Sequence, residues 1–360
     1  MKNTFGSAVS LTIFGESHGP AVGVVLDGLA PGVPVDEEYI RRQLSRRRPS
    51  TAMDTPRQEP DHYQICSGVW QGRTTGTPIA IVIPNENTRS GDYTYGLARP
   101  SHADYAAYCK YHGYEDWRGG GHFSGRLTAP LCFAGAVCGQ ILERRGIYTG
   151  AHIASVHGIS DDAFSRTKVT KEDILEVRGK DFPVRNDAQG EKMKEDIRNA
   201  SQGGESLGGI IECVTINMPA GVGSPIFEGL ENTIAQLIFG IPAVKGLEFG
   251  AGFQVAEMVG SQNNDPFYID ENGHVKTKTN NHGGILGGIS SGMPITLNVA
   301  IKPTASIAKP QETVDFRAKK NETLQIHGRH DPCIVPRAVP CVEAAVNIAL
   351  LSHMMDYPNF

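Results

Sequence analysis

The chain has 360 residues, of which 39% are hydrophobic and 20% are charged. Its 34 Lys and Arg residues against 39 Asp and Glu residues give a net charge of −5, which argues against a non-specific nucleic-acid binder. Recurrent aliphatic runs exclude disorder, yet none approaches the roughly 20 residues of a membrane helix, and the first residues lack the apolar stretch of a signal peptide.

Hydrophobic patterning predicts both strands and helices. In chain order, we expect a strand at 22–26, a helix at 36–46, a strand at 78–83, helices at 129–145 and 192–202, a strand at 210–216, a helix at 226–240, a strand at 295–301 and a helix at 339–355. Asp36 is a plausible cap of the first helix. Because the two kinds of element do not alternate regularly, an α+β fold is favoured over a doubly wound sheet.

The seven cysteines are odd in number, and no two have C-x-x-C spacing. This usage argues against a disulfide framework or a structural zinc site and favours a reducing cytoplasm. His327 and His330 lack a third nearby ligand, so no metal is expected. We expect most of the cysteines to be small buried apolar residues.

A weak internal repeat suggests a duplicated unit. Gly15-Glu16-Ser17-His18-Gly19 and Gly204-Glu205-Ser206-Leu207-Gly208 are each followed by an aliphatic strand and then by a Pro- and Gly-containing turn. The halves would meet near residues 185–200. Chance similarity is the alternative, because Gly-Glu-Ser is short. No low-complexity linker separates the halves, so we expect one domain over residues 1–360.

Separate clusters pair Arg or Lys with small residues and with His or Asp, at residues 46–49, 99–104, 118–126, 302–306 and 328–333. Arginine binds phosphate and carboxylate in a bidentate manner. The glycine-rich cluster at 118–126 feeds the predicted helix at 129, an arrangement suited to anions, but it is neither a Walker loop nor G-x-G-x-x-G. A loop-lined pocket for a multiply charged ligand is therefore predicted, with histidine acid–base candidates; the clusters themselves name no reaction.

Over nearly its whole length the sequence resembles the chorismate synthase family. The strongest matching motifs are Gly15–Gly19, residues 121–128 and Arg329-His330-Asp331-Pro332-Cys333, and residues 46–49, 99–104, 282–292 and 302–306 also fit. The resemblance implies a β-α-β sandwich with helices packed between antiparallel sheets, and a homotetramer. Because no segment corresponds to an intrinsic flavin reductase, a monofunctional, bacterial-type member is expected.

The resemblance also implies a reaction of the shikimate pathway to the aromatic amino acids. A phosphorus–oxygen lyase of this family removes phosphate from 5-enolpyruvylshikimate 3-phosphate by 1,4-anti elimination and forms chorismate. Reduced FMN (FMNH2) is required without net redox change, because it carries the difficult step. NADPH would act only as an indirect reductant through a separate flavin reductase. A small-molecule substrate is thus expected, with no nucleic-acid or membrane partner.

The family's functional residues can be carried over position by position. His18 matches the histidine that protonates the departing phosphate, His102 the histidine that stabilises the reduced flavin, and Asp331 the carboxylate that assists proton removal near flavin N5. The substrate-holding positions are Ser17, Arg47, Arg99, Ser124, Arg126 and Arg329. The flavin-contacting positions are His122, Phe123, Ser124, Pro242, Ala243, Gly287, Lys302, Pro303, Thr304, Ala305, Ser306 and Arg329.

Several positions depart from the family pattern. The second arginine that often follows the triplet is missing near Met53, and its role either passes to the nearest arginine, Arg57, or is absent. The flavin-site positions that differ are Gly125, Ala305, Pro242 and His122-Phe123. We expect these changes to alter flavin affinity rather than abolish function.

Two other classes of protein could use such clusters. A nicotinamide or flavin oxidoreductase would be supported by a dinucleotide fingerprint opening a βαβ unit, which the sequence lacks. A non-catalytic anion-binding protein would account for the arginines and glycines. It would not account for the combination of His18, His102 and Asp331.

Overall fold

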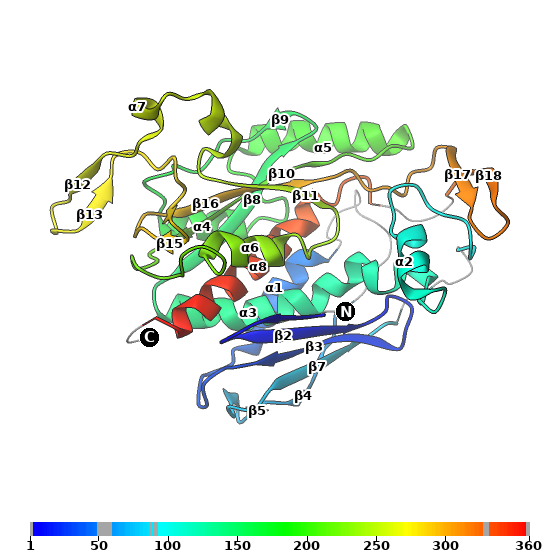
Figure 1. The fold of residues 1–360 in the computed structure, drawn as a ribbon, viewed down its shortest axis with the longest axis horizontal. Helices are drawn as coiled ribbons and strands as arrows, with labels where there is room; N and C mark the ends of the chain where they lie inside the picture. Colours follow the sequence, from blue (N-terminus) through cyan, green and yellow to red (C-terminus); the bar gives the residue numbers. More distant parts are fainter. Residues whose placement is uncertain (1–2, 49–59, 87, 89–92, 327–330, 358–360) are drawn as a thin grey trace.

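The computed structural model describes residues 3–48, 60–86, 88, 93–326 and 331–357, and it consists of two antiparallel sheets with helices between them (Figure 1). The first sheet has the strand order β1-β2-β3-β7-β4, with bounds Thr4–Gly6, Ser10–Gly15, Ala21–Asp27, Ile79–Pro84 and Gln64–Ser67. Its central pair aligns Val24 with Ile81, and both side chains are buried. Alternate residues of β3 and β7 therefore face the helices, as expected for a sheet with one covered face.

The second sheet has the order β11-β16-β10-β8-β9, with bounds Val244–Phe249, Ile295–Ile301, Gly209–Ile216, Tyr148–Val156 and Ile159–Ser160. All of its pairings are antiparallel. The four strands predicted from the sequence are confirmed as β3, β7, β10 and β16.

Four helices fill the space between the sheets: α1 (Glu37–Arg47), α3 (Thr128–Arg144), α6 (Leu230–Ile238) and α8 (Val335–Met355) (Figure 1). Helix α3 packs against β3 and β7, whereas α8 packs against β8 and β10. Helices α4 (Lys171–Arg178) and α5 (Asp187–Gln202) contact β8 and β9, and α4 forms a second small core with residues of β10. The predicted α+β fold and the sandwich of helices between antiparallel sheets are confirmed.

The long central helices need a correction to the sequence analysis. Residues Gly125–Arg144 and Val335–Met355 are long and apolar enough to span a membrane. In each of them, however, 89% of the apolar 18-residue stretch is buried inside the protein. They are core helices, because the two sheets and the neighbouring helices cover them on all sides.

Helix ends follow local chemistry. Asp36 caps α1 as predicted, since its Oδ1 accepts a hydrogen bond of 3.0 Å from Tyr39 N. Helix α5 begins earlier than predicted, at Asp187, where Asn186 is the cap. Helix α8 also begins earlier, at Val335, because proline is tolerated in a first turn. Helix α6 begins later, since Ile226 has a φ of 66° and lies outside the helix.

The remaining elements are short and lie in the connections. They are α2 (Asp104–Tyr111), α7 (Gly260–Asn263), the 3₁₀ turns η2 (Arg118–Phe123), η3 (Gly125–Leu127) and η4 (Gly252–Glu257), and the strand pairs β5 (Val69–Trp70) with β6 (Arg73–Thr74), β12 (Phe267–Ile269) with β13 (Val275–Thr277), β14 (Ile285–Leu286) with β15 (Ile289–Ser290), and β17 (Gln311–Asp315) with β18 (Lys320–Leu324).

The proposed duplication has one structural counterpart. The two Gly-Glu-Ser loops lead into β3 and β10, and each is the central strand of a five-stranded antiparallel sheet. However, β8 and β9 precede residues 185–200 and already belong to the second sheet. The duplication, its meeting point and the single-domain assignment stay predictions.

Candidate active site

A cavity of about 1120 Å³ lies where several distant segments meet. Its wall is built from the loop before α2, the turns η2 and η3, the loop between α6 and β11, residues 302–306 and the start of α8. Pockets for a single small ligand are roughly 300–1,000 Å³. The cavity is therefore large enough for two ligands side by side.

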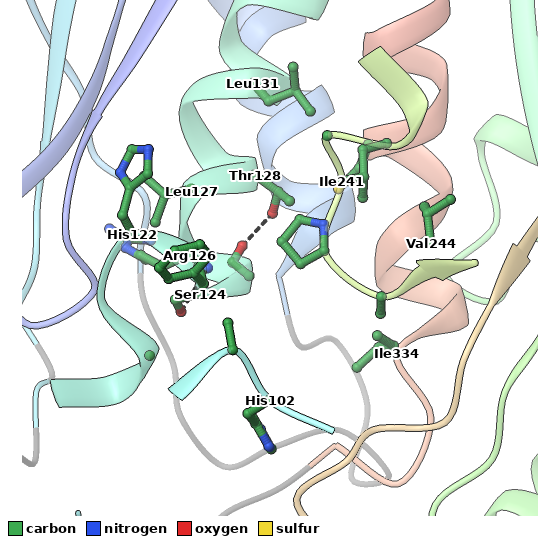
Figure 2. Close-up of a pocket in the computed structure, with 18 of the residues that line it drawn as sticks. His102, His122, Ser124, Arg126, Leu127, Thr128, Leu131, Ile241, Val244 and Ile334 are labelled. Atoms are coloured by element: carbon green, nitrogen blue, oxygen red, sulfur yellow. Dashed lines mark hydrogen bonds between the residues drawn. The ribbon is translucent and has the colours of Figure 1, made fainter. Parts of the chain in front are cut away.

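One side of the cavity is apolar. Leu127 and Leu131 come from η3 and α3, Ile241 and Val244 from the segment entering β11, and Ile334 from the residue before α8 (Figure 2). In this view Leu131, Ile241, Val244 and Ile334 lie along the top and right. The polar residues His122, Arg126 and Ser124 lie on the left, with Leu127 beside them, and His102 lies at the bottom. Such a wall suits a flat or apolar part of a ligand, with its charged parts directed to the polar end.

The polar part of the lining is strongly cationic. Seven basic side chains outnumber four carboxylates among the described lining residues, in a chain of net charge −5. The basic residues are Arg47, Arg48, Arg99, Arg126, Lys245, Lys302 and Arg337, and the acidic ones are Asp104, Glu115, Asp116 and Asp331. Such a concentration of positive charge attracts anions into the cavity.

Asp61 holds two of the predicted substrate-binding arginines together. Its side chain is fully buried; Oδ2 accepts from Arg47 Nη2 at 2.7 Å, and Oδ1 forms an ion pair with Arg126 Nη1. Burial alone would raise the pKa of Asp61, but the two guanidinium groups hold it below its ordinary value. The carboxylate is thus ionised and fixes both arginines in the cavity wall.

Asn85 connects Arg126 to the loop that carries His18. Its Oδ1 accepts from Arg126 Nε at 2.9 Å, and its Nδ2 donates to the carbonyl oxygens of Glu16 and Gly19, each at 2.9 Å. One amide side chain therefore sets the position of a cation and of a loop that are distant in sequence.

His18 lies directly behind the cavity wall. Its ring makes an edge contact with Tyr93, with centroids 5.5 Å apart, and it touches the backbone of Gly119. Tyr93 and Gly119 both line the cavity. Gly119 has a φ of 59°, and a Cβ there would lie 2.4 Å from the imidazole, so only glycine fits.

Hydrogen bonds connect the loop that contains His18 with the turn η2. Ser17 N donates to Gly121 O at 3.0 Å, and His122 Nδ1 donates to Gly15 O at 2.8 Å. Ser17 is fully buried, and its Oγ has no hydrogen-bond partner among the described residues. The predicted pair Ser17 and His18 is thus packed against the glycine-rich turn η2.

His102 is a neutral histidine in this environment. Its Nδ1 donates to Pro100 O and its Nε2 accepts from Ser306 Oγ, both at 3.1 Å. Burial and the neighbouring Arg99 lower the pKa of His102 to about 4. Arg99 itself is held by Asp104 through contacts of 2.8 and 2.7 Å.

Residues 302–306 form one edge of the cavity and are anchored at Lys302 and at Thr304. Lys302 Nζ donates to Ser101 O at 3.0 Å, and Ser206 Oγ donates to Thr304 O at 2.6 Å. Thr304 Oγ1 is buried and has no hydrogen-bond partner among the described residues. Its hydroxyl is therefore free to bond a ligand in the cavity.

Asp331 also lies in the lining, where it forms an ion pair with Arg337 Nη1. Arg337 Nε in turn donates to Arg47 O at 3.0 Å, so the start of α8 is joined to the end of α1.

Most of the residues predicted from the sequence meet at this cavity, but not all. The predicted residues in its lining are Arg47, Arg99, His102, His122, Phe123, Ser124, Arg126, Pro242, Ala243, Lys302, Pro303, Thr304, Ala305, Ser306 and Asp331. Ser17, His18 and Gly287 are not among the described lining residues. Gly287 lies in the β14–β15 turn beside the start of α6, whereas Pro242 follows the other end of that helix. Arg329 and Arg57 lie outside the described residues.

The sequence analysis missed Asp61, Asn85, Lys245 and Arg337. Arg48 was visible in the arginine triplet but was not assigned, and it lines the cavity with its Nη1 bonded to Pro60 O at 3.2 Å. No local pattern marks the others, because their partners are far away in sequence. Among the described residues, no group of three or more His, Cys, Asp or Glu side chains could hold a metal ion.

Comparison with known proteins identifies the family. A family model described as chorismate synthase matches residues 9–355. A chorismate synthase of Pyrococcus abyssi is 47% identical over 352 residues, covering 97% of this chain and 97% of that relative. One of Korarchaeum cryptofilum is 46% identical over 356 residues, covering 98% and 97%.

A solved structure agrees with these matches. A crystal structure of chorismate synthase superposes with a TM-score of 0.75 at 28% identity and covers 98% of this chain and 93% of the other. The resemblance seen in the motifs thus extends to sequence and fold over nearly the full length. The chain belongs to the chorismate synthase family.

Proposed function

We propose that this cavity is where the chain eliminates phosphate from 5-enolpyruvylshikimate 3-phosphate and forms chorismate. As a member of its family the chain is a lyase of the shikimate pathway. The observation that carries the assignment to this cavity is its cationic lining, which suits a substrate with one phosphate and two carboxylates.

The arginines are positioned before substrate arrives. Arg47 and Arg126 share Asp61, and Arg99 is clamped by Asp104. A guanidinium has five N–H donors; Arg47 Nε has no hydrogen-bond partner among the described residues, so Arg47 keeps a donor for a ligand while its orientation is fixed. Preorganised cations bind an anion without the entropic cost of ordering long side chains.

His18 is assigned the proton transfer to the departing phosphate. Its loop is held by Asn85 and by the bond from Ser17 N to Gly121 O, which keeps the imidazole against the cavity wall. A histidine fixed in this way can donate a proton near neutral pH. Asp331 is assigned the role of the base on the opposite segment, where its carboxylate is paired with Arg337.

The family implies a reduced flavin, and the residues of the cavity fit one. The apolar wall suits a flat ring, and the unpartnered Thr304 hydroxyl and the cationic lining suit a polar, phosphate-bearing tail. The residues that would hold FMN are His102, residues 122–124, Pro242, Ala243 and residues 302–306. When bound, reduced flavin supplies the electron-rich ring that assists cleavage of the C–O bond.

His102 would respond to an anion placed beside it. Its neutral imidazole keeps Nδ1–H on Pro100 O, and a negative charge nearby would raise its lowered pKa. We therefore assign it the stabilisation of a bound reduced flavin. Gly287 and Arg329 stay proposed flavin contacts on the resemblance alone.

Three further features belong to the proposal. NADPH would deliver electrons only through a separate flavin reductase. A cytoplasmic location is supported by the seven free cysteines. A homotetramer is supported by large apolar side chains left exposed on residues 226–286, namely Ile226, Phe227, Phe253, Phe267, Ile269 and Leu286.

An anaerobic assay tests the function. The protein is mixed with 5-enolpyruvylshikimate 3-phosphate and FMN, with or without dithionite, while chorismate and phosphate are followed. We expect both products only with reduced flavin. Binding of both ligands without product would favour an anion-binding protein, and steady NAD(P)H turnover without added reductase would favour an oxidoreductase.

A further inference from the structure

Two buried thiols face each other across the central helices. Cys132 on α3 and Cys341 on α8 have their Sγ atoms 3.7 Å apart, although all seven cysteines of the chain are free. Neither thiol has a role in the proposed reaction. The pair lies beside the active site, because Cys341 also lines the cavity.

The helices approach unusually closely next to this pair. One turn further along both helices, a Cβ on Gly135 would lie 2.2 Å from Ala344 Cβ, and beyond it one on Gly139 would lie 2.7 Å from Asn347 Nδ2. The successive contacts advance in the same direction on both helices, so α3 and α8 run parallel in matched register. Close backbones are the condition for a disulfide, whose Cα atoms are about 4.4–6.8 Å apart.

The two thiols are chemically unequal. The hydrogen bond donated by Cys132 Sγ and the nearby guanidinium of Arg47 hold the pKa of Cys341 below its ordinary value. The same hydrogen bond and burial raise the pKa of Cys132. The thiolate is the nucleophile, and of the two cysteines only Cys341 is among the described residues that line the cavity, so Cys341 is the member that an oxidant reaches first. Its Sγ donates to Arg337 O at 3.5 Å, and this proton must leave before the thiolate can react.

We propose that Cys341 is an oxidation site for small peroxides and that Cys132 resolves the product as a reversible disulfide between α3 and α8. The Cys341 thiolate attacks one peroxide oxygen, breaks the O–O bond and becomes a sulfenic acid, releasing hydroxide. The Cys132 sulfur then displaces the sulfenic oxygen as water. In total, two thiols and one hydrogen peroxide give one disulfide and two waters, and two electrons pass from sulfur to peroxide.

Resolution by Cys132 protects the cavity. Without it, further oxidation would leave a sulfinate on Cys341, a fixed negative charge near Arg47 that would compete with anionic ligands. Reduced flavin that meets dioxygen yields hydrogen peroxide; this source of oxidant rests on the proposed function, whereas the thiol chemistry does not.

The test uses hydrogen peroxide on the purified full chain. Cys66 and Cys109 are exposed, so both are replaced by serine to remove competing thiols. We expect the intact mass to fall by two hydrogen atoms and a phosphine reductant to restore it. After digestion with trypsin, peptide mapping should find Cys132, in the peptide of residues 127–144, linked to Cys341, in the peptide of residues 338–360. The same mapping on the unsubstituted chain shows whether the cross-link forms without the two serine substitutions, so the result does not depend on how the variant folds.

Variants separate the two roles. In the same background, Cys132→Ser should instead gain one oxygen at Cys341 and become trappable by a 1,3-dione, whereas Cys341→Ser should give neither product. Cys138→Ser is the matched control, because Cys138 is also buried on α3, and it should leave the cross-link unchanged. Three results would overturn the proposal. The first is oxygen added at Cys341 without a cross-link while Cys132 is present, and the second is a cross-link through Cys138. The third is no reaction at peroxide concentrations that oxidise the exposed cysteines of the unsubstituted chain.

Discussion

The amide of Asn85 accepts a hydrogen bond of 2.9 Å from Arg126 Nε while it donates to both ends of the turn that contains His18. The proposed proton donor and a proposed substrate-binding cation therefore share one positioning residue. A substitution of Asn85 should therefore disturb the positions of both His18 and Arg126.

Replacing Asn85 with alanine should lower kcat/KM about 5- to 150-fold. The reason is that leaving buried hydrogen-bonding groups without partners costs about 1–3 kcal/mol, here in the alignment of the loop and of Arg126. Steady-state kinetics with reduced FMN measures the effect, and Asn321→Ala on the exposed strand β18 is the control. Equal kinetics for the Asn85 variant and the unsubstituted chain would show that the loop needs no such support.

The turn at Gly119 gives a sharper test of His18. Gly119→Ala should displace the imidazole, because the new Cβ would lie 2.4 Å from it at a φ of 59°. Turnover should fall towards the about 10²–10⁴-fold loss expected for His18→Ala, which removes the general acid itself. Gly158→Ala is the matched control, since Gly158 also has a positive φ, of 84°, but its Cβ would meet no atom within 4 Å. If Gly119→Ala turns over normally while His18→Ala does not, the packing of the imidazole is not what matters.

Asp61→Asn should damage both stability and substrate binding. Removing one partner of a buried ion pair costs about 3–5 kcal/mol, since Arg47 and Arg126 would stay buried without their carboxylate. Urea unfolding should show the loss, and the KM for the phosphate ester should rise. The exposed Asp181→Asn is the control.

The same carboxylate predicts a pH dependence. The pKa of Asp61 is lower in the folded protein, so its contribution to stability is complete above the unfolded value and is lost as the pH falls through the folded value. Asp61→Asn should therefore flatten the acid limb of the stability profile. A variant that keeps the acid limb of the unsubstituted chain would contradict this assignment.

A second buried group predicts the opposite pH dependence. His152 lies between Asp161, at 2.9 Å from Nδ1, and Glu212, at 2.7 Å from Nε2, and its side chain is fully buried. Burial alone would lower the pKa of His152, but the hydrogen bonds to the two carboxylates raise it. Its contribution to stability is therefore complete below the unfolded histidine pKa of about 6.5 and is lost as the pH rises through the folded value.

Urea unfolding at a series of pH values tests this expectation. His152→Gln should be most destabilising at acidic pH, and the difference from the unsubstituted chain should shrink as the pH rises. His274→Gln, at an exposed position, is the control. A difference that is constant with pH would mean that His152 is neutral in the folded protein.

What the sequence could predict depends on the range of the interaction. The Asp36 cap and the strand at Ile295–Ile301 depend on neighbouring residues, and both were predictable. The motifs of the family also brought His102, Ser124 and Asp331 to one cavity. Asp61 and Arg337 could not be assigned, because their roles depend on partners brought together only by the packing of α1, α3 and α8. The start of α8 was predicted too late, because Pro336 and Pro340 disfavour a helix in the local sequence. Tertiary packing nevertheless stabilises the helix from Val335 onward.

The pairing of the cavity arginines with buried or half-buried carboxylates has a consequence for the end of the catalytic cycle. Both products, phosphate and chorismate, are anions and must leave the cations that held the substrate. Asp61, Asp104 and Asp331 are bonded to guanidinium groups in the structure. They offset part of the positive charge once the substrate has split in two, so departure of the products does not leave bare cations behind. We therefore expect the carboxylates to favour the release of both anionic products.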